Sequence, residues 1–355
     1  MPTPATSMPP VPPQPHFPGS YQRPQTTPTA ARLVRRPDGA GVAAFVYGTC
    51  SGARTPTLFL HGNGEEHGIF GPQIDAVVAS GHVAIAIDSR AQGKSTRGTA
   101  PLTYELMAAD ALACLDALGV ERAHLVGFSD GAIEALLIAR DHPRTAASLL
   151  SIGANLTPEG VMEEDGWDIR GTIATRRAWA KWAQELPADG ILDPALLTPT
   201  AGEAQMTADL LQLMLDEPHV DAVSLAAIVC PTTVMVGEFD CIVPAETNAI
   251  VCGVRAGGAR VRKVVVPDAG HSLPKEAPEA VTSELLELIG CAEHDEAARP
   301  HPGGLRDDDG TEQRCPPSDV HRLLGPVAGS VALTCSHRES PHRDHAGKPR
   351  HQQRP

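Results

Sequence analysis

Short apolar runs recur along the middle of the chain and alternate with longer segments that have the hydrophobic spacing of helices. Each run is bounded by Gly, Asp or Pro, as buried strands usually are. The runs lie at 43–47, 57–60, 83–87, 124–128, 148–152, 232–236 and 263–266, and the helical patterns at about 104–118, 131–141, 245–253 and 275–290. This alternation predicts right-handed crossovers and an α/β fold: a doubly wound, mostly parallel sheet of about eight strands with helices on both faces. The early pair 31–36 and 42–48, joined by Asp38-Gly39, predicts a hairpin at the sheet edge.

One interval interrupts the alternation. Residues 155–218 have a helical pattern and contain all three tryptophans of the chain, Trp167, Trp179 and Trp182. We interpret this interval as a cap inserted after the sixth major strand. Trp179 and Trp182 share one helix face because they are three residues apart. Two interpretations stay open for this pair: the rings pack the cap onto the main domain, or they line a substrate pocket.

The two ends of the chain differ in composition from its middle. Residues 1–30 are rich in Pro and Thr and carry a single charge, Arg23. Residues 292–355 hold seven of the fifteen histidines and many Pro and Arg residues. Such segments bury too little apolar surface to offset the entropy lost on ordering. We therefore expect a disordered arm at 1–30, a folded domain at 31–291 and a disordered tail at 292–355.

Composition and charge narrow the choice of partner. The formal net charge of −14 argues against nucleic acid or an anionic membrane as the main partner. No apolar run approaches the ~20 residues of a membrane-spanning helix, and the N-terminus lacks the pattern of a signal peptide. Eight irregularly spaced cysteines favour reduced thiols and a cytoplasmic location. We expect a monomer or homodimer that acts on a small-molecule substrate.

The segment Gly127-Phe128-Ser129-Asp130-Gly131 carries the clearest chemical signal. It follows the apolar run 124–128 and begins the helical pattern AIEALLIAR. A serine on a sharp strand-to-helix turn has a strained backbone that exposes its hydroxyl, and flanking glycines let the turn close. The helix N-terminus beneath it favours developing negative charge. Ser129 is therefore the candidate nucleophile.

A serine hydroxyl needs a base, and the base needs an orienting carboxylate. His271 follows the last predicted strand, and Asp240 follows the strand before it. The chain order of nucleophile, acid and base is one known for triads on open parallel sheets, whose sites lie at the C-terminal ends of the strands. We predict a triad of Ser129, Asp240 and His271, with Glu238 as the nearest alternative acid.

Acyl transfer also needs two preorganised donors for the oxyanion. The backbone N–H of Asp130, the residue after the nucleophile, is one candidate. The loop His61-Gly62-Asn63-Gly64 follows the run 57–60, and its glycines allow the main chain to approach a substrate. We favour the N–H of Asn63 as the second donor. Chemistry of this kind requires no cofactor and no metal.

Together these motifs resemble those of the α/β-hydrolases over about residues 31–291. The matching pieces are the His61-Gly62 loop, the segment Asp88-Ser89-Arg90-Ala91-Gln92-Gly93-Lys94-Ser95, the Gly127–Gly131 elbow, Gly237-x-x-Asp240 and Gly270-His271. The runs HGNGEE, GFSDG and GANLTPEG look like a bacterial branch of the family. The resemblance implies a serine hydrolase that cleaves a small-molecule ester, thioester or lactone through an acyl-enzyme on Ser129.

One departure from the family pattern is Asp130, where many relatives carry an uncharged residue. A carboxylate beside the nucleophile would oppose an oxyanion, so we expect its side chain to point away. Other functions stay open: a C–C bond hydrolase with the same triad, a cofactor-free peroxidase-like enzyme, or a ligand-binding homologue without catalysis. An intact triad argues against the last of these, and the fold alone does not identify a substrate.

Several further motifs have simpler explanations. His61 is expected to tie its loop to the neighbouring backbone. A zinc site formed by His61, Glu66 and His67 would lack a fourth ligand and helical spacing. The run Gly93-Lys94-Ser95-Thr96 resembles the end of a phosphate-binding loop, but that motif needs a glycine where this chain has Asp88. We therefore expect neither a metal nor a nucleotide at these positions.

Overall fold

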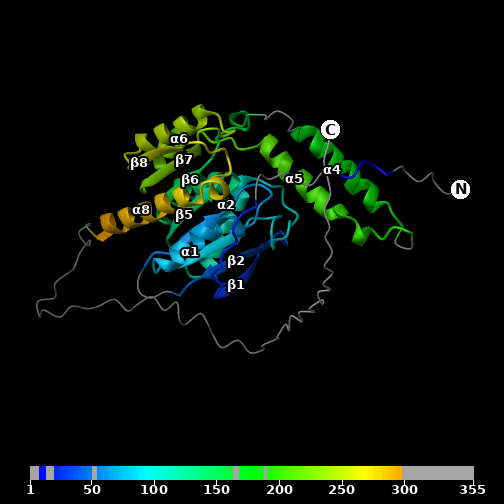
Figure 1. Cartoon of the computed structure of the whole chain (residues 1–355), viewed down its shortest axis with the longest axis horizontal. Coiled ribbons are helices and arrows are strands. Elements are labelled where there is room, and N and C mark those ends of the chain that lie inside the picture. The colour runs from blue at the N-terminus through cyan, green and yellow to red at the C-terminus, as the bar shows by residue number, and fades with distance from the viewer. Residues whose placement is uncertain (1–7, 13–19, 50–53, 163–167, 188–189, 298–355) are drawn as a thin grey trace, which may run out of the picture. The chain divides into compact units, whose positions relative to one another are not determined.

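An eight-stranded sheet forms the centre of the protein (Figure 1). The computed structural model describes residues 8–12, 20–49, 54–162, 168–187 and 190–297. The strand order is β1-β2-β4-β3-β5-β6-β7-β8. Strand β2 pairs antiparallel with both β1 and β4, and every other pairing is parallel. The predicted α/β class, the edge hairpin and the mostly parallel sheet are confirmed.

The strands coincide with the predicted apolar runs to within a few residues. They are β1 (Ala30–Arg35), β2 (Gly41–Tyr47), β3 (Thr57–Leu60), β4 (Ala84–Asp88), β5 (Ala123–Phe128), β6 (Ala146–Ile152), β7 (Thr232–Gly237) and β8 (Val261–Val266). The central strands β3 to β7 are buried along their whole length, because helices cover both faces. Continuous apolar runs are typical of such strands. The edge strands β1 and β8 are more exposed.

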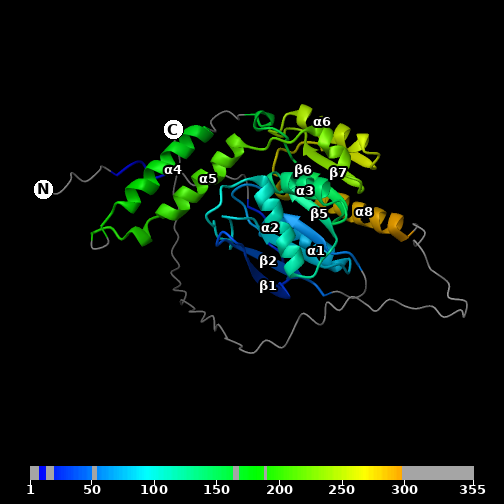
Figure 2. The same ribbon diagram turned by 180° about the vertical axis from the view of Figure 1, so that it is seen from behind.

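Two helical layers enclose the sheet. The helices are α1 (Gly71–Ala79), α2 (Tyr104–Ala117), α3 (Asp130–Asp141), α4 (Ile169–Gln184), α5 (Ala201–Asp216), α6 (Pro244–Ala256), α7 (Leu273–Glu276) and α8 (Pro278–Ala297). Figure 1 shows α1 and α8 in front of the sheet, and Figure 2, from behind, shows α2, α3 and α6. Leu136 and Ile250 belong to one hydrophobic cluster, and Ile74 and Leu285 to a second.

A helical insertion, called the cap below, lies between β6 and β7, where the sequence pattern predicts one. Its two long helices, α4 and α5, run side by side and extend beyond the sheet (Figures 1 and 2). The cap has hydrophobic clusters of its own. One joins Trp179 and Trp182 to Ala204, and another joins Ile173 to Leu211. Trp167, the third tryptophan, lies outside the described residues.

Residues 20–29 differ from the prediction of disorder for the arm 1–30, of which residues 1–7 and 13–19 lie outside the described part of the chain. The backbone N–H groups of Gln25 and Thr26 donate to the carboxylate of Asp75 on α1, at 2.8 and 2.9 Å. The Tyr21 hydroxyl donates to Glu66 at 2.9 Å. Strand β1 begins at Ala30. Polar contacts, rather than apolar burial, hold residues 20–29 against the domain, and the composition of the arm gave no sign of them.

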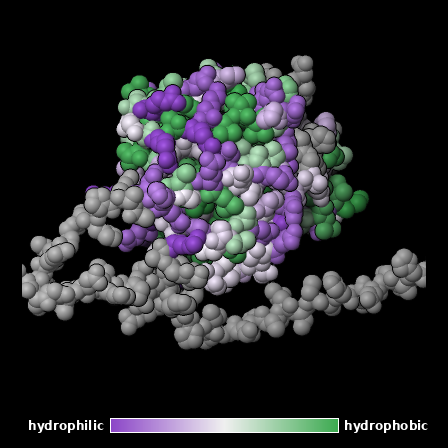
Figure 3. Space-filling model, turned by 60° about the vertical axis from the view of Figure 1, so that its left-hand side comes forward, coloured by the Kyte–Doolittle hydropathy of each residue, from purple (hydrophilic) through white to green (hydrophobic). Residues whose placement is uncertain are grey.

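The folded region also extends beyond the predicted boundary at residue 291. Helix α8 continues to Ala297, and acidic side chains of its last turns contact the main domain. Glu293 contacts His82 at 2.9 Å and Asp295 contacts Arg260 at 3.1 Å. Within the described residues, no helix is both long and apolar enough to cross a membrane. The face in Figure 3 mixes hydrophilic and hydrophobic residues.

Candidate active site

Ser129 lies at the tight turn between β5 and α3. Its backbone has φ 53° and ψ −119°, a left-handed conformation that an L-residue rarely adopts. The turn requires both flanking glycines. A Cβ at Gly127 would lie 2.2 Å from the carbonyl oxygen of Gly131, and a Cβ at Gly131 would lie 2.1 Å from that of Leu60. The predicted strand, elbow and helix are therefore present in that order.

His271 lies beside Ser129, although 142 residues separate them in the chain. Its Nε2 is 3.0 Å from the Ser129 hydroxyl, and its Nδ1 is 2.8 Å from Oδ1 of Asp240. Asp240 is almost fully buried, and its Oδ1 also accepts from the backbone N–H of Ile242. Glu238 is exposed and accepts instead from the N–H of Asp268 at 3.0 Å. The structure thus brings together the three residues that the sequence singled out as a triad.

Opposing effects act on the pKa of the His271 imidazole. Burial lowers the pKa of the imidazole, but the hydrogen bond to Asp240 and the neighbouring Cys241 outweigh this effect, and the net pKa is raised. Asp240 therefore stabilises positive charge on His271. That is the charge a base acquires when it accepts the proton of a serine.

The loop after β3 packs directly against the nucleophile. A Cβ at Gly62 would lie 3.1 Å from the Cβ of Ser129. His61 is buried and ties the loop together, as predicted: its Nε2 accepts from the N–H of Ser89, and its Nδ1 donates to the carbonyl of Gly62. Among the described residues, the backbone N–H groups of Asn63 and Asp130 donate to no protein acceptor. Both remain available to a ligand.

An ion pair connects this loop to the segment that carries His271. Lys275 on α7 contacts Glu65 at 2.6 Å, and both side chains are nearly fully buried. Burial raises the pKa of the Glu65 carboxyl, whereas Lys275 lowers it. Sequence reasoning missed the pair because its members are 210 residues apart. The pair fixes the loop after β3 relative to α7.

The sequence had led us to expect that the Asp130 side chain points away from the site, but it does not. Its side chain lines the pocket next to Ser129 and is 3% exposed. Asn63 Nδ2 donates to one carboxylate oxygen and the Tyr104 hydroxyl to the other, both at 2.9 Å. Burial raises the pKa of Asp130 to about 6, although both hydrogen bonds and the charge of His271 lower it. These donors lie far from Asp130 in sequence, so the motif gave no indication of them.

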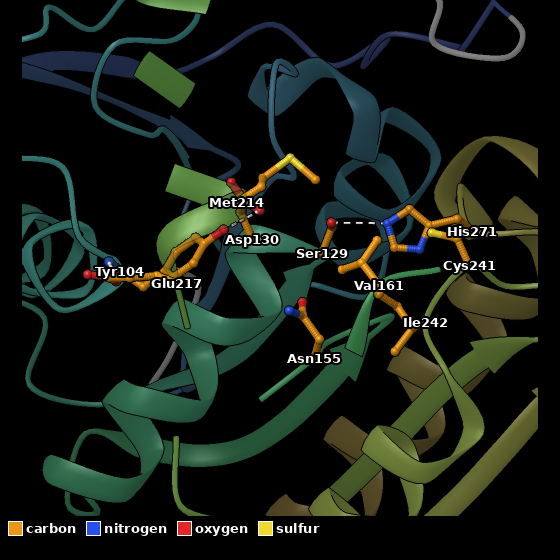
Figure 4. A pocket seen from close by; sticks show the side chains of 10 residues that line it. All are labelled: Tyr104, Ser129, Asp130, Asn155, Val161, Met214, Glu217, Cys241, Ile242 and His271. Atoms are coloured by element: carbon orange, nitrogen blue, oxygen red, sulfur yellow. Dashed lines mark hydrogen bonds between the residues drawn. The ribbon is translucent and has the colours of Figure 1, made fainter. Parts of the chain in front are cut away.

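The pocket over Ser129 is formed by both the sheet and the cap (Figure 4). Sequence reasoning identified Ser129, Asp130 and His271 among its lining residues. It missed the other seven, which come from five separate segments: Tyr104, Asn155, Val161, Met214, Glu217, Cys241 and Ile242. The positions of Asn155, three residues beyond β6, and of Cys241 and Ile242, in the loop after β7, could have indicated site residues, because loops at the C-terminal ends of strands form such sites.

Of the two interpretations left open for Trp179 and Trp182, the one in which they line the pocket over Ser129 does not match the structure. Neither residue is among those that line the pocket. Their ring centroids are 5.0 Å apart, and the Trp179 indole donates to the carbonyl of Pro199 at 2.7 Å. Both rings are buried between α4 and α5 with Ala204. The shared helix face was predicted correctly, but it faces the partner helix of the cap.

One cluster in the described part of the chain has the spacing of metal ligands. It consists of Asp240, Cys241 and His271. A metal there would occupy the atoms that orient His271, and it would compete with proton transfer from Ser129. His67, considered for a zinc site, instead contacts Asp88 at 2.7 Å and stacks on Phe45.

Comparisons with known proteins bear on the family and the fold of the chain. A model of the alpha/beta hydrolase family matches residues 57–284. RutD of Azorhizobium caulinodans, provisionally named a carbamate hydrolase, is 27% identical over 267 residues, which is 72% of this chain and 98% of that protein. 3-Oxoadipate enol-lactonase 1 of Acinetobacter baylyi is 26% identical over 52% of this chain and 70% of its own length.

Solved structures give the same picture of the fold. A thermophilic esterase from Thermogutta terrifontis is 25% identical, with a TM-score of 0.53, over 76% of this chain and 99% of that one. The enol-lactonase of Burkholderia xenovorans LB400 is 17% identical, with a TM-score of 0.55, over 71% and 97%. The second likeness concerns the fold alone.

Proposed function

Because the chain belongs to the alpha/beta hydrolase family, we propose that it is a serine hydrolase that cleaves a small-molecule ester, thioester or lactone through an acyl-enzyme on Ser129. The observation that carries the proposal is the unbroken chain of contacts from the Ser129 hydroxyl through His271 to Asp240. Relatives named as an enol-lactonase, an esterase and a provisional carbamate hydrolase support acyl transfer to water.

In the first half-reaction the Ser129 oxygen attacks the substrate carbonyl while His271 Nε2 takes the hydroxyl proton. Asp240 holds the Nδ1–H tautomer and stabilises the imidazolium that forms. The oxyanion accepts hydrogen bonds from the N–H groups of Asn63 and Asp130. When the tetrahedral intermediate collapses, His271 returns the proton to the leaving group, and the acyl group stays on Ser129.

In the second half-reaction water replaces the leaving group. His271 removes a proton from water as the water oxygen attacks the acyl carbonyl, and then returns a proton to the Ser129 oxygen. The carboxylic acid leaves and the triad is restored. All proton transfers are carried by His271, so beyond the substrate and the attacking water this cycle uses only groups of the chain itself.

A fluorophosphonate probe tests the proposal directly. An activated serine attacks the phosphorus and becomes covalently labelled, and mass spectrometry locates the adduct. We expect the adduct on Ser129, loss of labelling in Ser129→Ala, and unchanged labelling in Ser224→Ala, whose serine does not line the pocket. An unlabelled wild type, or labelling that survives Ser129→Ala, would favour a ligand-binding protein without catalysis. A screen of esters, thioesters, lactones and carbamates then identifies the scissile bond.

A further inference from the structure

The wall of the pocket opposite His271 is rich in hydrogen-bond acceptors. In Figure 4, Tyr104 and Glu217 lie on one side of the pocket, and His271 with Cys241 lies on the other. Asp130 lies between these two sides in the same view. No Lys or Arg is among the lining residues. The pocket therefore presents two carboxyl groups to a ligand, and His271 is its one ionisable group that can be cationic.

Glu217 is the carboxyl group with capacity left for a ligand. Its Oε2 accepts from the backbone N–H of Tyr104 at 3.1 Å, and in the described part of the chain it forms no ion pair. The oxygens of Asp130, in contrast, already accept from Asn63 and Tyr104. Glu217 is only partly buried, so a bound molecule can reach it.

The surroundings of Glu217 leave the pKa of its carboxyl raised. It caps the C-terminus of α5, where the helix dipole places partial negative charge. Burial is the largest cause that raises the pKa of Glu217, and the like charges of Glu105 and Asp216 raise it further, whereas the N–H of Tyr104 and the neighbouring His219 lower it. A positive group bound beside Glu217 would relieve this repulsion. A negative group would add to it.

Asn155 adds another acceptor to the pocket. Its Nδ2 donates to the carbonyl of Thr157 at 2.8 Å, which leaves the amide oxygen as the atom free to accept from a ligand. The apolar residues Val161 and Ile242 lie on the side of the triad (Figure 4). The pocket thus has apolar residues on the side of the triad and hydrogen-bonding groups on the side of Tyr104 and Glu217 (Figure 4).

We propose that the substrate carries a cationic nitrogen, such as a primary ammonium, several bonds from the scissile carbonyl, and that Glu217 binds this nitrogen. This inference rests on the proposed function, since it assigns a substrate class to the same pocket. The apolar chain between the two groups packs against Val161 and Ile242. The ammonium donates to Glu217 and to the amide oxygen of Asn155.

Protection of Ser129 from the fluorophosphonate probe tests the inference with three small ligands of similar shape: butylammonium, 1-butanol and butanoate. We expect butylammonium to protect at a concentration about fivefold to tenfold below that needed for 1-butanol, as for one partly exposed ion pair. Butanoate should protect least. Glu217→Gln keeps an acceptor for the N–H of Tyr104 but removes the negative charge. In this variant butylammonium and 1-butanol should protect equally well.

Asp216→Asn is the matched control. Asp216 is the neighbouring exposed acid, its removal changes the net charge equally, and it does not line the pocket. This variant should retain the preference for butylammonium. Equal protection by all three ligands in the wild type, or an equal loss in both variants, would overturn the inference. If Ser129 is not labelled at all, the proposed function itself fails, so the two failures are distinguishable.

Discussion

Asp130→Asn should change how the stability of the protein depends on pH. The folded protein holds the Asp130 carboxyl at a pKa raised from 3.8 to about 6, chiefly by burial. A carboxyl whose folded pKa exceeds its unfolded value binds a proton more tightly in the folded state. Its contribution to stability is present below about pH 4 and is lost as the pH rises through about 6. A shift of about 2 pKa units corresponds to about 3 kcal/mol.

Asparagine has nearly the same shape as aspartate and does not ionise. The free energy of unfolding of Asp130→Asn, relative to the wild type, should therefore increase by about 3 kcal/mol between about pH 4 and pH 7. A change in local hydrogen bonding alters this difference in the free energy of unfolding by the same amount at pH 4 and at pH 7. The dependence of the difference on pH is therefore what tests the reasoning. Tyr104→Phe removes a donor that lowers the pKa, and it should move the window to higher pH.

Urea unfolding of both proteins at closely spaced pH values measures the difference directly. A difference between Asp130→Asn and the wild type that is flat across this range, or that falls as the pH rises, would refute the reasoning. Such a result would mean that the Asp130 carboxylate is as well solvated in the folded protein as in the unfolded chain. Fluorophosphonate labelling of the same samples shows whether the pocket has kept its shape.

Three other changes test separate parts of the structure. Lys275→Met leaves Glu65 buried without this partner and should lower the free energy of unfolding, measured with urea, by about 3–5 kcal/mol. The double variant Lys275→Met with Glu65→Leu should recover most of the lost stability. Asp240→Asn should keep its melting temperature but lose about 10⁴-fold in turnover of an acyl ester, because the histidine adopts the wrong tautomer. Turnover by Glu238→Gln should stay near that of the wild type, and reversed effects would reassign the acid. A chain ending at residue 292 should melt below one ending at 297 in calorimetry, since it lacks the contact of Glu293 with His82, and equal melting temperatures would show that these last turns add nothing.

Local sequence patterns predicted most of the sheet and the elbow. Buried parallel strands are continuous apolar runs, so β3 to β7 were recognisable. The turn around Ser129 was recognisable because only glycine fits at its two flanks. Helix α1 was missed, since its short pattern follows a loop rich in glycine.

Features that depend on distant partners could not be read from the sequence. The i, i+3 spacing of Trp179 and Trp182 defines a helix face, but it does not say what covers that face. The orientation of Asp130 depends on donors from two remote segments, Asn63 and Tyr104. Glu217 reaches the pocket only because the cap returns to the main domain at the end of α5. Its neighbours in the sequence carry no motif.

Because the cap packs mostly against itself, it can be replaced as a unit. Helices α4 and α5 bury Trp179, Trp182 and Ile173 largely against each other, so much of the apolar surface of the cap needs no support from the sheet. The two ends of the cap meet just beyond β6, at the end of the sheet that holds the nucleophile, where the backbone N–H of Val220 donates to the carbonyl of Leu156 at 2.9 Å. Recombination at these junctions would replace Met214 and Glu217 while leaving Ser129 and its partners in position. A lineage with this architecture can therefore acquire new substrates without rebuilding its chemistry.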